Sequence, residues 1–71
     1  MIEMVPAISE AIDMFVYDDQ QLVLTISFVS GSRYEYAMVP PRIFEEFKAA
    51  GSRGRYFIAE IRNFFPYARV G

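Results

Sequence analysis

The chain has 71 residues and a mass of 8.2 kDa, which suffices for one domain and leaves no room for a second. Its 54% of hydrophobic residues excludes a disordered segment, and the absence of cysteine and histidine excludes disulfides, thiolate or imidazole metal sites, and nucleophiles that depend on either residue. A net charge of -2 excludes a polycation that coats nucleic acid by bulk electrostatics. We therefore expect one compact, non-catalytic domain over residues 1–71, without a metal or cofactor.

The first residues, Met1-Ile2-Glu3-Met4, lack the cationic start and the apolar run of a secretion signal. Charged residues interrupt the chain too often for a membrane span. We therefore expect a cytoplasmic protein with no membrane partner.

Three strands are predicted before residue 40. Residues 22–28 place apolar side chains at every second position, which is the period of a half-buried strand. Residues 12–17 and 33–38 give the strands before and after it, joined by the polar stretches 18–21 and 30–32. The three strands are expected to form an antiparallel meander.

The pairing of the last two strands follows from which face each side chain occupies. A three-residue loop over 30–32, with Gly31 or Ser32 left-handed, makes every facing pair apolar or aromatic. The expected pairs are Phe28 with Tyr34, Ile26 with Tyr36, and Leu24 with Met38. Tyr34 and Tyr36 then face the core.

Two helices are predicted after the proline pair at 40–41, which ends the sheet and can begin a helix. The first helix has one apolar stripe, made by Ile43, Phe44, Phe47 and Ala50. Gly51 is expected to end it in the left-handed conformation, and Ser52 to cap the second. In the second helix the stripe is made by Phe57, Ile58, Ile61, Phe64 and Phe65, and Pro66 ends it. The sequence therefore predicts an α+β fold of order β-β-β-α-α, with both helices on one face of the sheet.

One feature does not fit a two-layer monomer. If the first strand presents Ile12, Met14 and Val16 to the core, then Phe15, Val23 and Val29 point away from it. One interpretation is that the N-terminal segment 2–8 covers a strand edge, or that these are scattered exposed apolar residues. The other, which we prefer, is a homodimer that closes the second face or pairs edge strands.

Two short motifs have both a structural and a chemical interpretation. Adjacent carboxylates at Asp18 and Asp19 could hold a hard cation, but they lack the spaced ligands of a calcium loop and favour a turn. The segment 51–55, Gly-Ser-Arg-Gly-Arg, resembles a phosphate cradle without the lysine and spacing of a P-loop. A turn between helices with a serine cap is the simpler interpretation, although the two arginines make an anion site physically reasonable.

Positive charge gathers late in the chain. Residues 1–20 carry five acidic and no basic residues, whereas residues 51–71 carry four arginines and one glutamate. Tyrosines interleave with these arginines, a mixture that can stack bases and neutralise phosphates of single-stranded nucleic acid. By contrast, Glu35 and Glu60 form no acid-base or nucleophilic constellation with Ser52 or Tyr56.

An ordered set of residues resembles the KTSC domain, named for a segment at the C-terminus of some lysyl-tRNA synthetases and also found as small bacterial proteins. The set is Tyr17-Asp18, Phe28, Gly31, Tyr34-Glu35-Tyr36, Val39-Pro40, Ala50, Ser52, Gly54, Tyr56-Phe57, Ile61-Arg62 and Arg69-Val70. The resemblance covers residues 9–70 and implies family motif positions at Tyr34, Tyr36, Ser52 and Gly54. Ile58 and Phe65 depart from it, where the family often has Asn and Tyr.

The resemblance implies a role in RNA binding and brings no catalytic residue. We therefore expect a small binding module for RNA or single-stranded nucleic acid, whose site residues are Arg53, Arg55, Arg62, Arg69 and Tyr56. The alternative is a homodimerisation or protein-interaction module that uses the second apolar face and has no nucleic-acid role. Under the alternative alone, Phe15→Asp or Val23→Asp should disrupt assembly.

Overall fold

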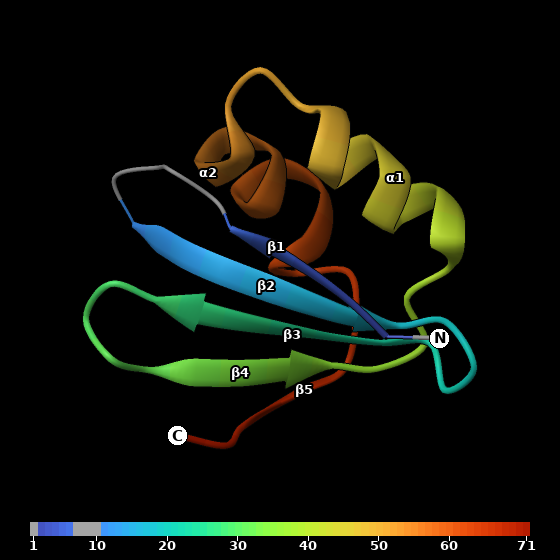
Figure 1. Cartoon of the computed structure of the whole chain (residues 1–71), viewed down its shortest axis with the longest axis horizontal. Coiled ribbons are helices and arrows are strands. Elements are labelled where there is room, and N and C mark those ends of the chain that lie inside the picture. The colour runs from blue at the N-terminus through green and yellow to red at the C-terminus, as the bar shows by residue number, and fades with distance from the viewer. Residues whose placement is uncertain (1, 7–10) are drawn as a thin grey trace.

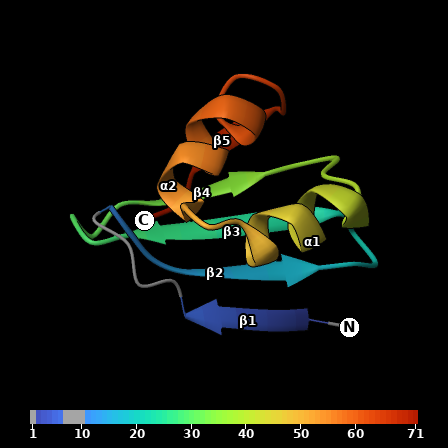
Figure 2. The same ribbon diagram turned by 90° about the horizontal axis from the view of Figure 1, so that it is seen from above.

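The computed structural model describes residues 2–6 and 11–71, which form one antiparallel sheet and a layer of helices (Figure 1). The sheet has five strands in chain order, β1 (Ile2–Pro6), β2 (Ile12–Asp18), β3 (Val23–Phe28), β4 (Arg33–Tyr36) and β5 (Tyr67–Arg69). The helical layer consists of α1 (Pro41–Ala49), α2 (Arg53–Tyr56) and the π-helical turn η1 (Phe57–Ile61) that continues α2. All of it lies on one face of the sheet (Figure 2).

The predicted α+β class and the one-sided helical layer are confirmed, but the sheet has five strands where three were predicted. β1 pairs with β2 along the edge of the meander, so the interpretation in which the N-terminal segment covers a strand edge is confirmed for Ile2–Pro6. β5 pairs with β4 on the opposite edge. Segments of five and three residues are too short for an alternation of apolar and polar side chains to be recognised in the sequence. They become strands because they pair with the edge of a neighbouring strand.

The inward face of β2 differs from the prediction. A bulge between Ile12 and Met14 shifts the register of β2 against β3. Because the bulge adds one residue to β2, each later side chain of the strand lies on the face opposite to the one that strict alternation from Ile12 predicts. Ile12, Phe15 and Tyr17 are consequently buried, while Met14 and Val16 are half-buried. The predicted outward orientation of Phe15 is therefore wrong, because strict alternation does not hold across a bulge.

The hairpin between β3 and β4 is displaced by two residues from the predicted register. Ile26 pairs with Tyr34 and Leu24 with Tyr36, so the loop occupies residues 29–31 and not 30–32. A shift of two keeps every side chain on its face, and Tyr36 is buried and Tyr34 half-buried on the core side as predicted. Gly31 has φ +98°, which confirms its left-handed conformation.

The end of β4 is also earlier than predicted. Met38 has φ 62°, a left-handed conformation that no strand continues, and its side chain is 71% exposed. It therefore has no pairing with Leu24, and the fourth strand ends at Tyr36.

Helix α1 buries three of the four residues of its predicted stripe, and the fourth, Ala50, is half-buried and lies beyond the end of the helix. Ile43, Phe44 and Phe47 are buried, and Pro41 occupies the first turn. The helix ends when Ala50 takes an extended conformation (ψ 140°), so the left-handed end predicted at Gly51 is wrong. The predicted cap on the next helix is confirmed, because the Ser52 hydroxyl accepts a hydrogen bond from the Arg55 amide at 3.3 Å.

The second helix widens into a π-helical turn, which changes the exposure of its apolar residues. The Arg62 amide donates to the Phe57 carbonyl, five residues back, at 2.9 Å. Phe57 and Ile61 are buried as predicted, but Ile58 is 56% and Phe64 66% exposed. Helical structure stops at Ile61, so Phe64 falls in the following turn and the predicted stripe is too long.

The core lies between the helices and the strands and is dominated by aromatic rings. Phe15 packs against Phe44 and Phe47 at ring-centroid distances of 5.9 and 4.2 Å. The buried Tyr17 hydroxyl donates to the Val39 carbonyl at 2.7 Å, which ties β2 to the segment leading into α1. Within the described ranges, no helix has the length and hydropathy needed to cross a bilayer.

Candidate functional site

A groove of about 510 Å³ opens between the second helix and the strands β3 and β4, beside β5. Five of its lining side chains are aromatic: Phe28, Tyr34, Tyr36, Phe57 and Tyr67. Two neighbouring polar side chains, Arg62 and Asn63, also line it. We call this site the aromatic groove, and its volume lies in the range of about 300–1,000 Å³ that is usual for small-molecule sites.

Strand pairing builds one wall of the groove. β5 places Tyr67 directly opposite Tyr36, and Arg69 opposite Tyr34, so all four residues lie on the helix-facing side of the sheet. The ring of Tyr67 is tilted against Tyr36 and Tyr34, at centroid distances of 5.5 and 5.8 Å. Because Tyr67 is 61% exposed, this wall ends in an accessible aromatic ring.

The π-helical turn supplies the opposite wall. Phe57 is buried and meets the rings of Tyr36 and Phe28 edge-on, at 5.7 and 5.4 Å. Ile58 and Arg62 follow on the same turn and line the groove while remaining exposed. The extra residue of a π-helical turn thus coincides with the site, a position where such turns are frequent in proteins.

The groove combines the phenols of Tyr34, Tyr36 and Tyr67 with one guanidinium, that of Arg62. Burial raises the pKa of Tyr36, and the neighbouring phenols of Tyr67 and Tyr34 raise it further, while the Arg62 guanidinium acts in the opposite direction. Tyr36 therefore stays protonated at neutral pH and can donate a hydrogen bond. The described lining includes no carboxylate, so the groove favours a neutral or anionic ligand.

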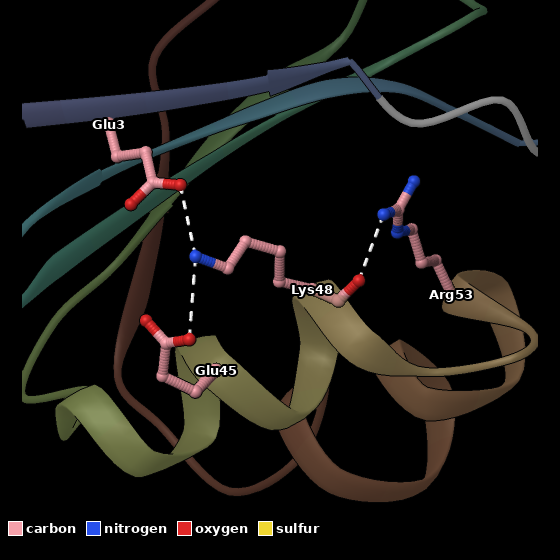
Figure 3. Close-up of polar contacts among 4 residues, drawn as sticks. All are labelled: Glu3, Glu45, Lys48 and Arg53. Carbon is pink, nitrogen blue, oxygen red and sulfur yellow. Dashed lines mark hydrogen bonds and ion pairs between the residues drawn. The ribbon is translucent and has the colours of Figure 1, made fainter.

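Arg53 does not line the groove and contacts the end of α1 instead (Figure 3). Its Nη2 donates to the Lys48 carbonyl at 2.9 Å, and its guanidinium lies 5.7 Å from the centre of the Phe15 ring. The Lys48 ammonium in turn bonds Glu3 of β1 at 3.0 Å and Glu45 at 3.4 Å. These contacts tie the end of α1 to the start of α2 and to β1.

Tyr56 and Ser52 are also engaged within the helical layer. The Tyr56 hydroxyl donates to Oε1 of Glu46 at 2.7 Å, and its ring stacks on Phe47 at 5.7 Å. Burial, followed by the hydrogen bond to Glu46, raises the pKa of Tyr56 to about 12. The bonds from Tyr56 and Arg42 lower the pKa of Glu46. Ser52 serves as the helix cap described above.

The structure thus brings together part of the predicted set. Tyr34, Tyr36, Gly54 and Arg62 line the groove, and Arg69 is paired with Tyr34 beside it, its Nε donating to the Gly71 carbonyl at 2.9 Å. The remaining four predicted residues do not line it: Ser52, Arg53, Arg55 and Tyr56. Arg55 is exposed on α2.

Several groove residues were absent from the predicted site. Phe28 and Phe57 are core residues by periodicity and belong to the set that resembles the KTSC domain, and Tyr67 is one of the tyrosines interleaved with the late arginines, but none of the three was among the predicted site residues. Nothing in the letters distinguishes Asn63. Of the two departures from the resembled pattern, Ile58 lines the groove, whereas Phe65 packs against the core.

The carboxylates form a turn and not a cation site. Asp18 Oδ1 accepts hydrogen bonds from the amides of Gln20 and Gln21, at 3.0 and 3.3 Å. Across residues 2–6 and 11–71, no group of three or more acidic side chains is arranged to hold a metal ion.

The chain is similar in sequence to known proteins. The chain is similar to a lysine–tRNA ligase of Nostoc punctiforme, with 39% identity over 59 residues, which are 83% of this chain and 10% of the ligase. It is also similar to a protein of Tsukamurella paurometabola, with 40% identity over 75% of this chain and 79% of that protein. The chain therefore spans about a tenth of the length of the ligase and most of the smaller relative.

The fold is likewise similar to the crystal structure of a KTSC domain protein from Yersinia pestis. The two share 31% sequence identity and a TM-score of 0.93, over the full length of both chains. The KTSC domain family itself matches residues 8–65, which is most of the sequence. This chain therefore belongs to the KTSC domain family.

Proposed function

We propose that this protein is a non-catalytic cytoplasmic module that binds single-stranded RNA in the aromatic groove. The observation that carries the proposal is the composition of that groove: five aromatic rings, one guanidinium and no carboxylate in its described lining. Single-stranded RNA is bound elsewhere by bases stacked on aromatic rings and by arginines that contact phosphates. The groove offers both kinds of contact within one site.

Tyr67 is the residue best placed to stack a base. It is 61% exposed, and its two ring contacts in the groove are tilted, so they leave ring surface available. Base stacking on an aromatic side chain contributes about 1–3 kcal/mol, which corresponds to about 5- to 150-fold in affinity.

Three arginines are placed to contact phosphates of the same strand. Arg62 lines the groove, Arg69 is paired with Tyr34 at its edge, and Arg55 is exposed on α2. Arg53 is given no phosphate contact, because it is half-buried, with its guanidinium bonded to the Lys48 carbonyl and 5.7 Å from the centre of the Phe15 ring, whereas Arg69 is exposed. The similarity to part of a lysine–tRNA ligase, a protein named for its action on tRNA, supports an RNA ligand.

Fluorescence anisotropy with a labelled single-stranded RNA tests the proposal. Three phosphate contacts should make log K fall with log salt at a slope of about -2 between about 50 and 200 mM. Tyr67→Ala should weaken binding at least about fivefold, whereas Tyr67→Phe, which keeps the ring, should not. No binding at about 50 mM salt, or equal binding by Tyr67→Ala, would refute the proposal.

A second candidate function is homodimerisation through the sheet face opposite the helices. No described element covers that face (Figure 1), and it carries the half-buried apolar side chains of Met14, Val16 and Val23. Phe15 has no part in it, because it belongs to the core. Val23→Asp should lower the mass measured by light scattering to that of a monomer, and Val29→Asp, in the exposed β3–β4 turn, should not. A monomeric unmodified protein would exclude this candidate.

A further inference from the structure

We infer that the aromatic groove holds one nucleotide at a time, with a single base stacked on the Tyr67 ring and the phosphate of that nucleotide on Arg62. A free nucleoside monophosphate is then a ligand in its own right. This inference rests on the proposed function and specifies how the RNA would bind. One nucleotide of the RNA strand would enter the groove, and the rest of the strand would be held only through the phosphates on either side of that nucleotide.

The size of the groove sets the first limit. A volume of about 510 Å³ lies in the range of single small-molecule sites. Phe57 and Tyr36 are buried and in ring contact at 5.7 Å, so the exposed Tyr67 is the lining ring with the most surface open to a base. Extended single-strand sites instead present a succession of exposed rings along a charged channel.

Charge sets the second limit. Five aromatic rings without a charged neighbour would also suit a quaternary ammonium group, which binds over ring faces. Here Arg62 lines the groove and no carboxylate in its described lining offsets that charge, so a cation is repelled and an anion is attracted. A ligand with both a flat ring and a phosphate matches the rings and the guanidinium together.

The side-chain amide of Asn63 can form hydrogen bonds with the edge of a base. The Asn63 amide lines the groove and makes no side-chain hydrogen bond within the described residues. An amide offers one donor group and one acceptor, the combination that pairs with the edge of a base. Tyr36 stays protonated, because burial raises its pKa, and it adds a donor in the same site.

Competition and NMR titration of the whole chain test the inference. Adenosine 5′-monophosphate should displace a labelled single-stranded RNA and shift the amides of Arg62, Asn63 and Tyr67. Adenosine should bind at least about tenfold more weakly, since it lacks the charge-assisted contact. Arg62→Gln should lower the affinity for the monophosphate at least about tenfold and should change the affinity for adenosine much less. The matched control is Arg42→Gln, which removes the same charge from an exposed position on α1 and should change neither.

The inference is overturned if the RNA binds and the monophosphate does not compete, if adenosine and its monophosphate bind equally, or if inorganic phosphate or choline binds as well as the monophosphate. In the first of these cases the proposed RNA binding survives. If the monophosphate binds and the RNA does not, the inference holds and the proposed function fails. If neither binds, both fail.

Discussion

The bulge in β2 leads to a sharp prediction about stability. The Phe15 side chain is fully buried against Phe44 and Phe47, whereas Val16 is half-buried on the open face of the sheet. Truncating a buried phenylalanine to alanine costs about 3–5 kcal/mol. A chain of 71 residues has a total stability of about 4–11 kcal/mol, so Phe15→Ala should leave the protein close to unfolding.

A milder pair of variants keeps the comparison measurable. Phe15→Leu retains an apolar side chain and should lower the free energy of unfolding by about 1–2 kcal/mol, which is a fall of roughly 5–15 °C in Tm. Val16→Ala removes two methyl groups that are already half in water and should cost about 1 kcal/mol or less. Urea denaturation followed by circular dichroism measures both values.

Comparing the destabilisation by Phe15→Leu with that by Val16→Ala shows which of the two residues faces the core. If Val16→Ala is more destabilising than Phe15→Leu, then Phe15 lies on the open face and strict alternation holds through β2. The bulge, and the core built on it, would then be wrong.

Three further predictions concern single residues. Gly31→Ala should cost about 1–2 kcal/mol, because φ +98° is strained for any residue with a Cβ, whereas Gly51→Ala should be neutral or stabilising by up to about 1 kcal/mol; thermal denaturation compares them. The Tyr56 phenol should titrate near pH 12 by ultraviolet difference spectroscopy, and Glu46→Gln should lower that pKa but leave it above 10, because burial is the larger cause. Its raised pKa in the folded state should favour folding below about pH 10, and this contribution should disappear as the pH rises from about 10 to about 12; a Tyr56→Phe variant should lack that loss. Tyr67→Ala should change the Tm by less than Phe15→Leu does, because Tyr67 is 61% exposed, and a larger fall would show that it is needed for folding.

Only part of the aromatic groove could be predicted from patterns in the sequence. Alternation places Tyr34 and Tyr36 on the core side of the sheet, and charge identifies Arg62 as a candidate site residue; all three line the groove. The other wall could not be derived, because Tyr67 reaches the site only through the pairing of a three-residue strand with β4. Arg53, Arg55 and Arg62 have the same charge, so the sequence does not distinguish them. In the fold, Arg53 bonds the Lys48 carbonyl, Arg55 is exposed on the surface, and Arg62 lines the groove.

The sequence by itself determined the class of fold, the central strands, the apolar stripe of α1, the cap at Ser52 and the turn at Gly31. Each of these features depends on local periodicity or on the backbone freedom of one residue, so it can be predicted from residues that are close together in the sequence. The tertiary structure decided the two edge strands, the bulge that turns Phe15 inward, the π-helical turn, and the groove where β5 meets the second helix. These depend on contacts between residues far apart in the chain, where packing against a partner outweighs the local preference.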